Sequence, residues 1–188
     1  MRIDPKYFPR FMITVAVISF AAIAWSTISY QNRRLASFEE TLPERLQELS
    51  IESLSEISIE MSSIPPNGQD ESTLLYPTTL VFWAPWSEES VQTLRTEIEN
   101  PSTRRVISLP VKDSDENIRA ILTEVHKSLK EFEVKRVKTY DGTPYYQSWE
   151  LPGVPTVIVL ENPIQGSFIV GTKREAVSFE LDDSLRIE

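Results

Sequence analysis

The hydrophobic pattern of the chain opens with one long apolar stretch. Residues 11–30, FMITVAVISFAAIAWSTISY, contain no charged side chain, and 20 residues are enough for one helical crossing of a bilayer. Trp25 and Tyr30 lie near its end, where aromatic side chains favour the membrane interface. We therefore interpret residues 1–10 as a short N-terminal tail and residues 11–30 as a single-pass transmembrane anchor or uncleaved signal anchor.

The charges around this stretch give an orientation. Arg2, Lys6 and Arg10 precede it, Arg33 and Arg34 follow it closely, and the chain then turns acidic. The positive-inside rule then favours a cytoplasmic N-terminus and an extracytoplasmic main domain, on the periplasmic side in a bacterium. The same basic start also fits a cleaved signal peptide ending near Ala22-Ile23-Ala24, and that alternative stays open.

Residues 31–53 have apolar positions at helical spacing and form a juxtamembrane stalk or helix in this interpretation. The apolar positions are Leu35, Phe38, Leu42, Leu46 and Leu49. Thr41 is expected to cap a second half of the helix, with Pro43 in its first turn. The stripe fits the first helix of the following domain, and the alternative is a docking helix for a partner in the membrane plane.

Short apolar patterns alternate through residues 54–188, which we take as one domain. The expected strands are 57–61, 78–84, 106–111, 154–160 and 168–170, and the expected helices are 87–100, 114–132 and a stretch around 174–181. Asp141 to Pro144 reads as a turn. Strands alternating with helices, followed by a hairpin, predict an α/β sandwich with a mixed central sheet.

Composition excludes several kinds of function. The formal net charge of −9 argues against nucleic acid binding, which needs clustered basic residues. The 188 residues include no Cys, so disulfides and thiol chemistry are excluded. His126 is the single histidine, and we expect a partly exposed helix residue rather than a metal ligand. No phosphate-binding glycine motif is present, and we expect no cofactor and no metal.

Two motifs carry a resemblance. The sequence Phe82-Trp83-Ala84-Pro85-Trp86, followed by four residues and a helix, resembles the active-site corner of thioredoxins. Val154-Pro155-Thr156 resembles the cis-proline loop of that family, and Gly171 resembles the glycine after its last strand. The resemblance covers about residues 54–180.

The distance between the two motifs narrows the resemblance to one branch. Ser90 and Pro155 lie 65 positions apart, which resembles the membrane-anchored, extracytoplasmic branch related to cytochrome c maturation and thiol-reducing proteins. That branch implies an inserted helix and strand, here the strand 106–111 and the helix 114–132. The resemblance therefore implies a thioredoxin-like sandwich with an insert, preceded by one N-terminal transmembrane helix.

The resemblance fails at the chemistry of the family. Ser87-Glu88-Glu89-Ser90 occupies the Cys-x-x-Cys positions. Thiol–disulfide exchange needs a thiolate and a second sulfur, and a serine hydroxyl stays protonated even after a shift of a few pKa units. The family's buried acid is also missing, since its positions hold Val81 or Thr93. We therefore expect no enzyme and no catalytic residue.

The expected function is a redox-inactive, membrane-anchored binding or scaffold module, such as a subunit or assembly factor of an extracytoplasmic membrane complex. Its partners would be proteins in or at the membrane, with the bilayer contacted by residues 11–30. We expect Trp83 to pack in the core and Trp86 to be exposed. The degenerate motif comprises Trp83, Pro85, Trp86, Ser87, Glu88, Glu89 and Ser90, and the peptide groove comprises Val154, Pro155 and Thr156. The alternatives are a thiol–disulfide oxidoreductase represented by a Cys-to-Ser variant, and a peptide-holding chaperone.

Overall fold

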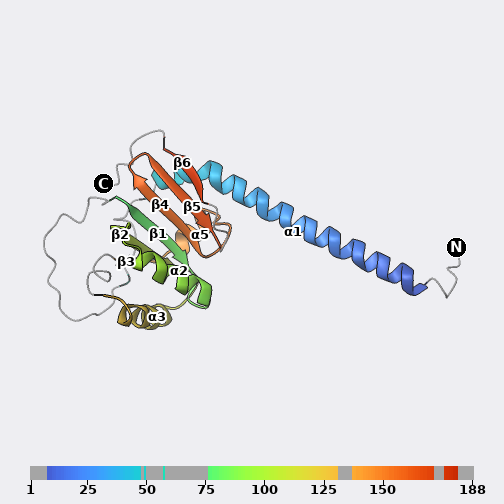
Figure 1. Cartoon of the computed structure of the whole chain (residues 1–188), viewed down its shortest axis with the longest axis horizontal. Helices are drawn as coiled ribbons and strands as arrows, with labels where there is room; N and C mark the ends of the chain where they lie inside the picture. Colours follow the sequence, from blue (N-terminus) through green and yellow to red (C-terminus); the bar gives the residue numbers. More distant parts are fainter. Residues whose placement is uncertain are drawn as a thin grey trace. The chain divides into compact units, whose positions relative to one another are not determined.

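The structure is a computed structural model that describes residues 8–47, 49, 57, 76–130, 137–171 and 176–181. The chain divides into two units, residues 1–37 and 38–188. In the first unit, the described part belongs to helix α1, Phe8–Gln47 (Figure 1). This helix is long and apolar enough to be a candidate transmembrane span, as the sequence predicted.

Helix α1 continues without interruption into the second unit. Phe38, Leu42 and Leu46 are fully buried there, and Pro43 lies inside the helix. The expected cap at Thr41 is wrong, because the Thr41 hydroxyl donates to the Phe38 carbonyl within the helix at 3.5 Å. A proline in a helix interior costs about 3 kcal/mol, whereas burying each large apolar side chain contributes roughly 1.5–3 kcal/mol. Packing therefore outweighs the proline at this position.

The second unit is built on one mixed six-stranded sheet in the order β3-β2-β1-β4-β5-β6. The strands are β1 (Thr78–Trp83), β2 (Arg105–Pro110), β3 (Val137–Thr139), β4 (Thr156–Asn162), β5 (Gln165–Val170) and β6 (Val177–Glu180). β1, β2 and β3 are parallel, and β4, β5 and β6 pair antiparallel (Figure 1). The prediction of an α/β sandwich with a mixed central sheet is confirmed.

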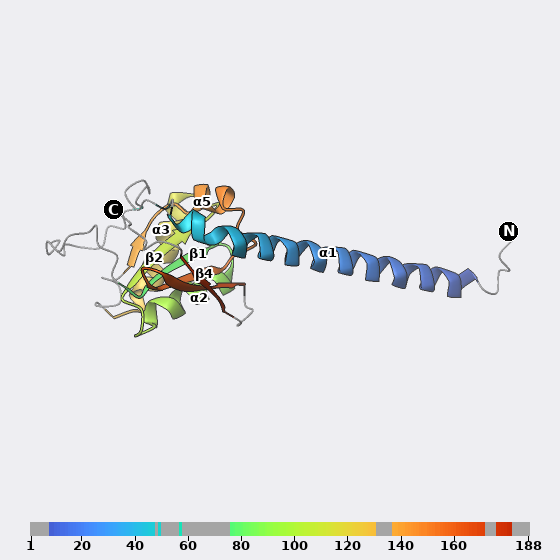
Figure 2. The ribbon, with the colours of Figure 1, turned by 90° about the horizontal axis from the view of Figure 1, so that it is seen from above.

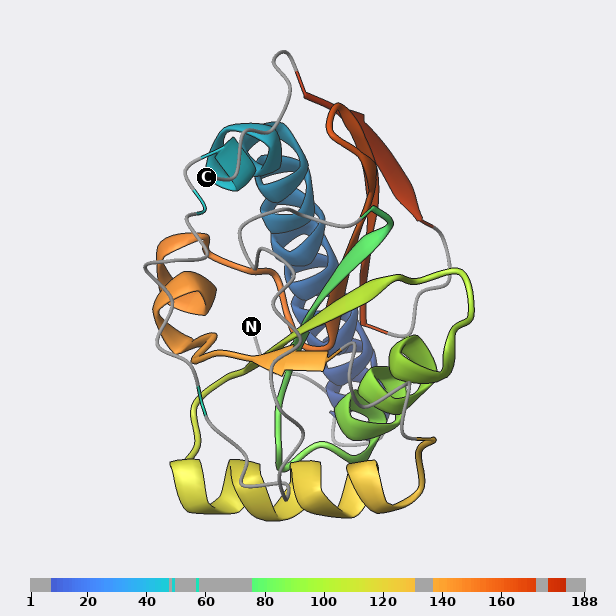
Figure 3. The same ribbon diagram turned by 90° about the vertical axis from the view of Figure 1, so that its left-hand side faces the viewer.

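Helices cover both faces of this sheet. Helices α2 (Glu88–Glu99) and α3 (Asp115–Lys127) lie together on one face, as Figure 3 shows. Figure 2 shows α2 and the short helix α5 (Thr143–Ser148) on opposite sides of β1 and β4. Helix α2 lies between β1 and β2 in the chain, and α3 lies between β2 and β3. This order agrees with the predicted strand 106–111 and the predicted helix that follows it.

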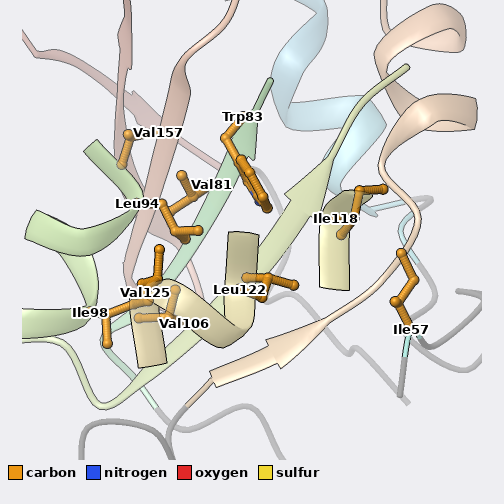
Figure 4. Packing of buried hydrophobic residues seen from close by; sticks show 10 residues of the cluster. All are labelled: Ile57, Val81, Trp83, Leu94, Ile98, Val106, Ile118, Leu122, Val125 and Val157. Atoms are coloured by element: carbon orange, nitrogen blue, oxygen red, sulfur yellow. The ribbon is translucent and has the colours of Figure 1, made fainter. Parts of the chain in front are cut away.

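Most side chains of the core between the sheet and α2 and α3 are apolar. Figure 4 shows its side chains, which come from β1, β2, β4, both helices and the single residue Ile57: Ile57, Val81, Trp83, Leu94, Ile98, Val106, Ile118, Leu122, Val125 and Val157. The opposite face carries aromatic contacts. Phe168 meets Phe38 edge to face with ring centroids 5.3 Å apart, and Phe82 contacts Trp149 at 5.8 Å. Both faces of β1 are therefore buried.

The structure of residues 176–181 shows that one prediction is wrong. Residues around 174–181 were expected to be helical, but Val177–Glu180 form strand β6 beside β5. The polar and apolar side chains alternate there, and Phe179 is buried while Glu180 is exposed. Residues 172–175 lie outside the described residues.

Three other predicted segments differ in part from the structure or lie partly outside the described residues. Residues 143–148 form α5, where the sequence predicted only a turn, and Pro144 suits the first turn of that helix. The predicted strand 57–61 lies outside the described residues except for Ile57, whose amide donates to the Thr139 carbonyl at 2.9 Å. The predicted helix 114–132 is found as α3, but it ends at Lys127, so the prediction is too long over 128–130; residues 131–132 lie outside the described residues.

Candidate functional site

The thioredoxin-like corner begins where β1 ends. Trp83, the last residue of β1, is fully buried, and its indole N–H donates to the Ser108 hydroxyl at 2.8 Å. Three residues later, Trp86 has 59% of its surface exposed. Pro85 is buried between them. The two tryptophans thus differ as the sequence predicted: one anchors the corner in the core and the other faces solvent.

The two serines of the corner have different structural situations. Ser87 is the N-cap of α2, and its hydroxyl accepts from the Ser90 amide at 3.2 Å. Ser90 is fully buried, and its hydroxyl has no hydrogen-bond partner within the described chain. A cap of this kind stabilises a helix by about 0.5–2 kcal/mol. Ser87 therefore has a structural role that needs no reactive oxygen.

The positions where the family keeps a buried acid hold other residues. Val81 is fully buried in the apolar core. Thr93 is partly exposed, and its hydroxyl donates to the Glu89 carbonyl one turn earlier at 2.9 Å. Neither side chain can accept a proton at neutral pH. Glu88 and Glu89 are exposed in the first turn of α2.

The second motif lies directly beside the corner. Thr156 is opposite Phe82 in the antiparallel pair of β1 and β4. The Val154–Pro155 peptide bond is cis, and the Pro155 carbonyl accepts from the Gly171 amide at 2.7 Å. Gly171 has a φ of 67°, a conformation that favours glycine. The structure therefore brings together all three segments that carried the resemblance.

Val154 differs from its neighbours in having open main-chain groups. It is partly exposed, and neither its N–H nor its carbonyl bonds to any residue in the described part of the chain. Thr156 contributes a bond inside the loop, from its hydroxyl to the Gly153 carbonyl at 2.7 Å. An extended chain lying along this loop would find one donor and one acceptor available.

Sequence reasoning missed a loop at the edge of the sheet where β1 and β2 end and the corner begins. The Lys112 amide donates to the Thr143 hydroxyl at 3.1 Å, and its ammonium lies 4.5 Å from the centre of the Tyr146 ring. Lys112 has a φ of 55°, which is unfavourable for a residue with a side chain. The Trp149 ring contacts Phe82 in a tilted arrangement and Tyr145 edge to face, with ring centroids 5.8 Å and 5.5 Å apart. No local signal in the sequence identifies the contacts of Lys112 or the contact of Phe82 with Trp149, because they join residues far apart in the chain.

His126 lies in α3, as expected, but the expectation that it is partly exposed is wrong. Only 6% of its surface is exposed, and burial lowers the pKa of its imidazole below the ordinary value. No group of three or more His, Cys, Asp or Glu side chains that could hold a metal ion is found among the residues that the structure describes.

No protein-family model matches the chain, and no curated protein matches it. Two solved structures are similar in part. One is a secreted Mycobacterium tuberculosis disulfide oxidoreductase homologous to E. coli DsbE, with 10% identity, a TM-score of 0.40 and coverage of 52% of this chain and 70% of that chain. The other is M. tuberculosis DsbF in its mixed oxidized and reduced forms, with 14% identity, a TM-score of 0.37 and coverage of 50% and 69%. The fold assignment rests on the sheet order and connections of the chain itself.

Proposed function

We propose that the chain is a redox-inactive, membrane-anchored thioredoxin-like module that binds an extended segment of a protein partner. In this proposal it serves as a subunit or assembly factor of an extracytoplasmic membrane complex. The observation that carries the proposal is the exposure of Trp86, 59%, at a corner whose neighbouring loop leaves the Val154 main chain open.

The exposed tryptophan supplies the contact area. Indole rings are enriched in protein interfaces because they bury a large area at small cost in side-chain entropy. Trp86 and Ile164 are the large apolar side chains of the second unit that are exposed within its described part, and Ile164 lies at the opposite end of β4. Trp86 is therefore the apolar contact that the corner offers a partner.

The main chain of Val154 supplies directional contacts. Backbone pairing to an extended segment uses N–H and carbonyl groups and needs no sulfur. The side chains at positions 87 and 90 support the same proposal, because Ser87 caps α2 and Ser90 is buried. A corner that binds without reacting needs a rigid support rather than a nucleophile, and the cap provides that support.

The experiment is a mild-detergent pull-down of the full-length protein from its own membranes, with mass spectrometry of the captured proteins. Trp86→Ala is the test variant. Ile164→Ala is the matched control, because Ile164 is also an exposed apolar side chain, at 48%, but lies away from the corner. We expect the wild type and the control to recover a stoichiometric set of membrane-complex subunits, and Trp86→Ala to lose it.

Other outcomes point to the alternatives. A diffuse set of unfolded extracytoplasmic proteins would favour a peptide-holding chaperone. Recovery of nothing above background would contradict both binding roles. A second assay measures disulfide reduction by the purified chain, and turnover above the buffer rate would contradict the redox-inactive assignment. A natural gene with Cys at positions 87 and 90 would establish the oxidoreductase alternative.

A further inference from the structure

Two helices begin in the same way at the edge of the sheet that carries the corner. The parallel strands β1 and β2 end level, with Trp83 opposite Pro110. Each strand is followed by a short loop, a serine cap and a helix. Ser87 caps α2 and Ser114 caps α3, each accepting a main-chain N–H of the first turn. Both helix starts therefore lie at one edge, on one face of the sheet.

Each of these helix starts carries a pair of acids. They are Glu88 and Glu89 on α2, and Asp115 and Glu116 on α3. All four side chains are exposed, and none forms an ion pair with a residue that the structure describes. Acids in a first turn stabilise a helix through its dipole, and that role alone accounts for their positions. It leaves the carboxylates accessible to a partner.

The charge of this edge is negative after the cations are counted. Asp113 and Asp141 lie in the loops of the same edge and add two carboxylates to the four. Among the residues that the structure describes at this edge, Lys112 and Arg119 stand against these six, and the two helix ends contribute about half a positive charge each. Among these described residues the acids outnumber the cations, and the exposed Trp86 lies two residues before the first acid pair, Glu88 and Glu89.

We propose that the segment bound at the corner is basic: an extended stretch with an apolar residue against Trp86 and Lys or Arg on both sides of it. This inference rests on the proposed function and specifies its partner. Side chains of a strand alternate at about 3.3 Å per residue, so basic residues two and four positions from the anchor would lie roughly 7–13 Å away. Charges within about 10 Å still attract at an ionic strength near 0.1 M.

The test uses the full-length chain in nanodiscs of neutral phosphatidylcholine, so that the lipid itself does not attract basic peptides. Three fluorescent peptides share one apolar anchor and one length, and are flanked by Lys, Gln or Glu. Anisotropy titrations give the dissociation constants at low and high salt. We expect the Lys peptide to bind about tenfold more tightly than the Gln peptide at low salt, with the advantage shrinking as salt rises.

Two matched variants locate the charges responsible. The test variant is Glu88→Gln/Glu89→Gln/Asp115→Asn/Glu116→Gln. The control neutralises four exposed acids placed elsewhere on the same unit: Glu99, Glu124, Glu161 and Glu180. We expect the test variant to bind the Lys and Gln peptides within about threefold of each other and the control to keep most of the preference. Lys112→Gln is expected to tighten binding of the Lys peptide.

The outcomes separate this inference from the proposed function. Equal binding of the three peptides, lost in Trp86→Ala, would overturn the basic partner and leave the binding corner standing. Tightest binding of the Glu peptide would overturn the inference outright, as would equal losses in the test and control variants. Binding of no peptide would overturn both proposals.

Discussion

The hydrogen bond from Trp83 to Ser108 gives the sharpest test of how the corner is held. Both residues are fully buried, and the indole N–H donates to the hydroxyl at 2.8 Å. Because Trp83 ends β1 and the corner follows it directly, this bond fixes the base of the corner to β2. We propose a double-mutant cycle with Ser108→Ala, Trp83→Phe and the double variant.

The magnitude follows from the burial of both partners. Ser108→Ala deletes one oxygen but leaves a buried indole N–H without an acceptor, which costs about 1–3 kcal/mol. Trp83→Phe removes that donor and also some volume, which adds a cavity cost. The double variant keeps the cavity but has no unsatisfied group. Its loss of stability should therefore be smaller than the sum of the two single losses by about 1–2 kcal/mol.

The assay is pulse proteolysis of the full-length protein in mild detergent over a urea series, which reports the unfolded fraction without relying on tryptophan fluorescence. Ser178→Ala serves as the control, because Ser178 lies on β6 but is exposed. That control should stay within about 0.5 kcal/mol of the wild type. An additive cycle, or a Ser108→Ala variant as stable as the control, would refute the role given to this bond.

Three further predictions follow from the same structure. Ser87→Ala should lower the free energy of unfolding by about 0.5–2 kcal/mol, because it removes the cap of α2. Ser90→Ala should leave the free energy of unfolding equal or higher, because it removes a buried hydroxyl that has no hydrogen-bond partner among the described residues. Urea midpoints that fall for both variants would contradict this pair of predictions. Burial lowers the pKa of His126 in the folded state below the unfolded value of 6.5. The neutral imidazole therefore contributes stability that is fully present above pH 6.5 and is lost as the pH falls through the folded-state pKa. Over that pH window the urea midpoint should drop less in His126→Gln than in the wild type, and identical pH profiles of the two proteins would count against this prediction. Gly166→Ala should be strongly destabilising in a thermal melt, because a Cβ there would lie 2.5 Å from the Phe179 ring and 2.6 Å from the main-chain oxygen of Val159. An unchanged melting temperature would contradict this close packing of β4, β5 and β6.

The central strands were predictable because burial on both faces leaves a plain mark on the sequence. Residues 78–84 were predicted as a buried strand, and β1 covers Thr78–Trp83 with all its residues buried. The expected helix 87–100 is α2 with its cap at Ser87. In both cases the local preference and the tertiary environment favour the same structure.

The predictions failed where packing overrides local preference. Pro43 argued for a helix boundary, but the buried Leu42 and Leu46 keep α1 continuous. The tail has helix-compatible residues, yet it forms β6 because Phe179 packs closely against Gly166 of β5. The spacing of Leu42 and Leu46 indicated a helix but not that it would run through Pro43. The contact of Phe179 with Gly166 leaves no local signal, since it depends on pairing with another strand.

The candidate site was predictable only in part for the same reason. The motif residues of the corner carry a resemblance in their own sequence, and Trp86 is exposed as predicted. Lys112 and Tyr146 have no such motif. They reach the edge because β2 ends beside β1 and because Lys112 bonds to Thr143, which is 31 residues away.

The unequal situations of the two serines constrain the mutational routes open to the corner. At position 90, cysteine would replace a buried hydroxyl that has no partner with a side chain that packs as a small hydrophobe. At position 87, the same change removes the cap of α2. Selection for stability would therefore admit a sulfur at 90 and resist one at 87, and a single buried thiol cannot complete disulfide exchange.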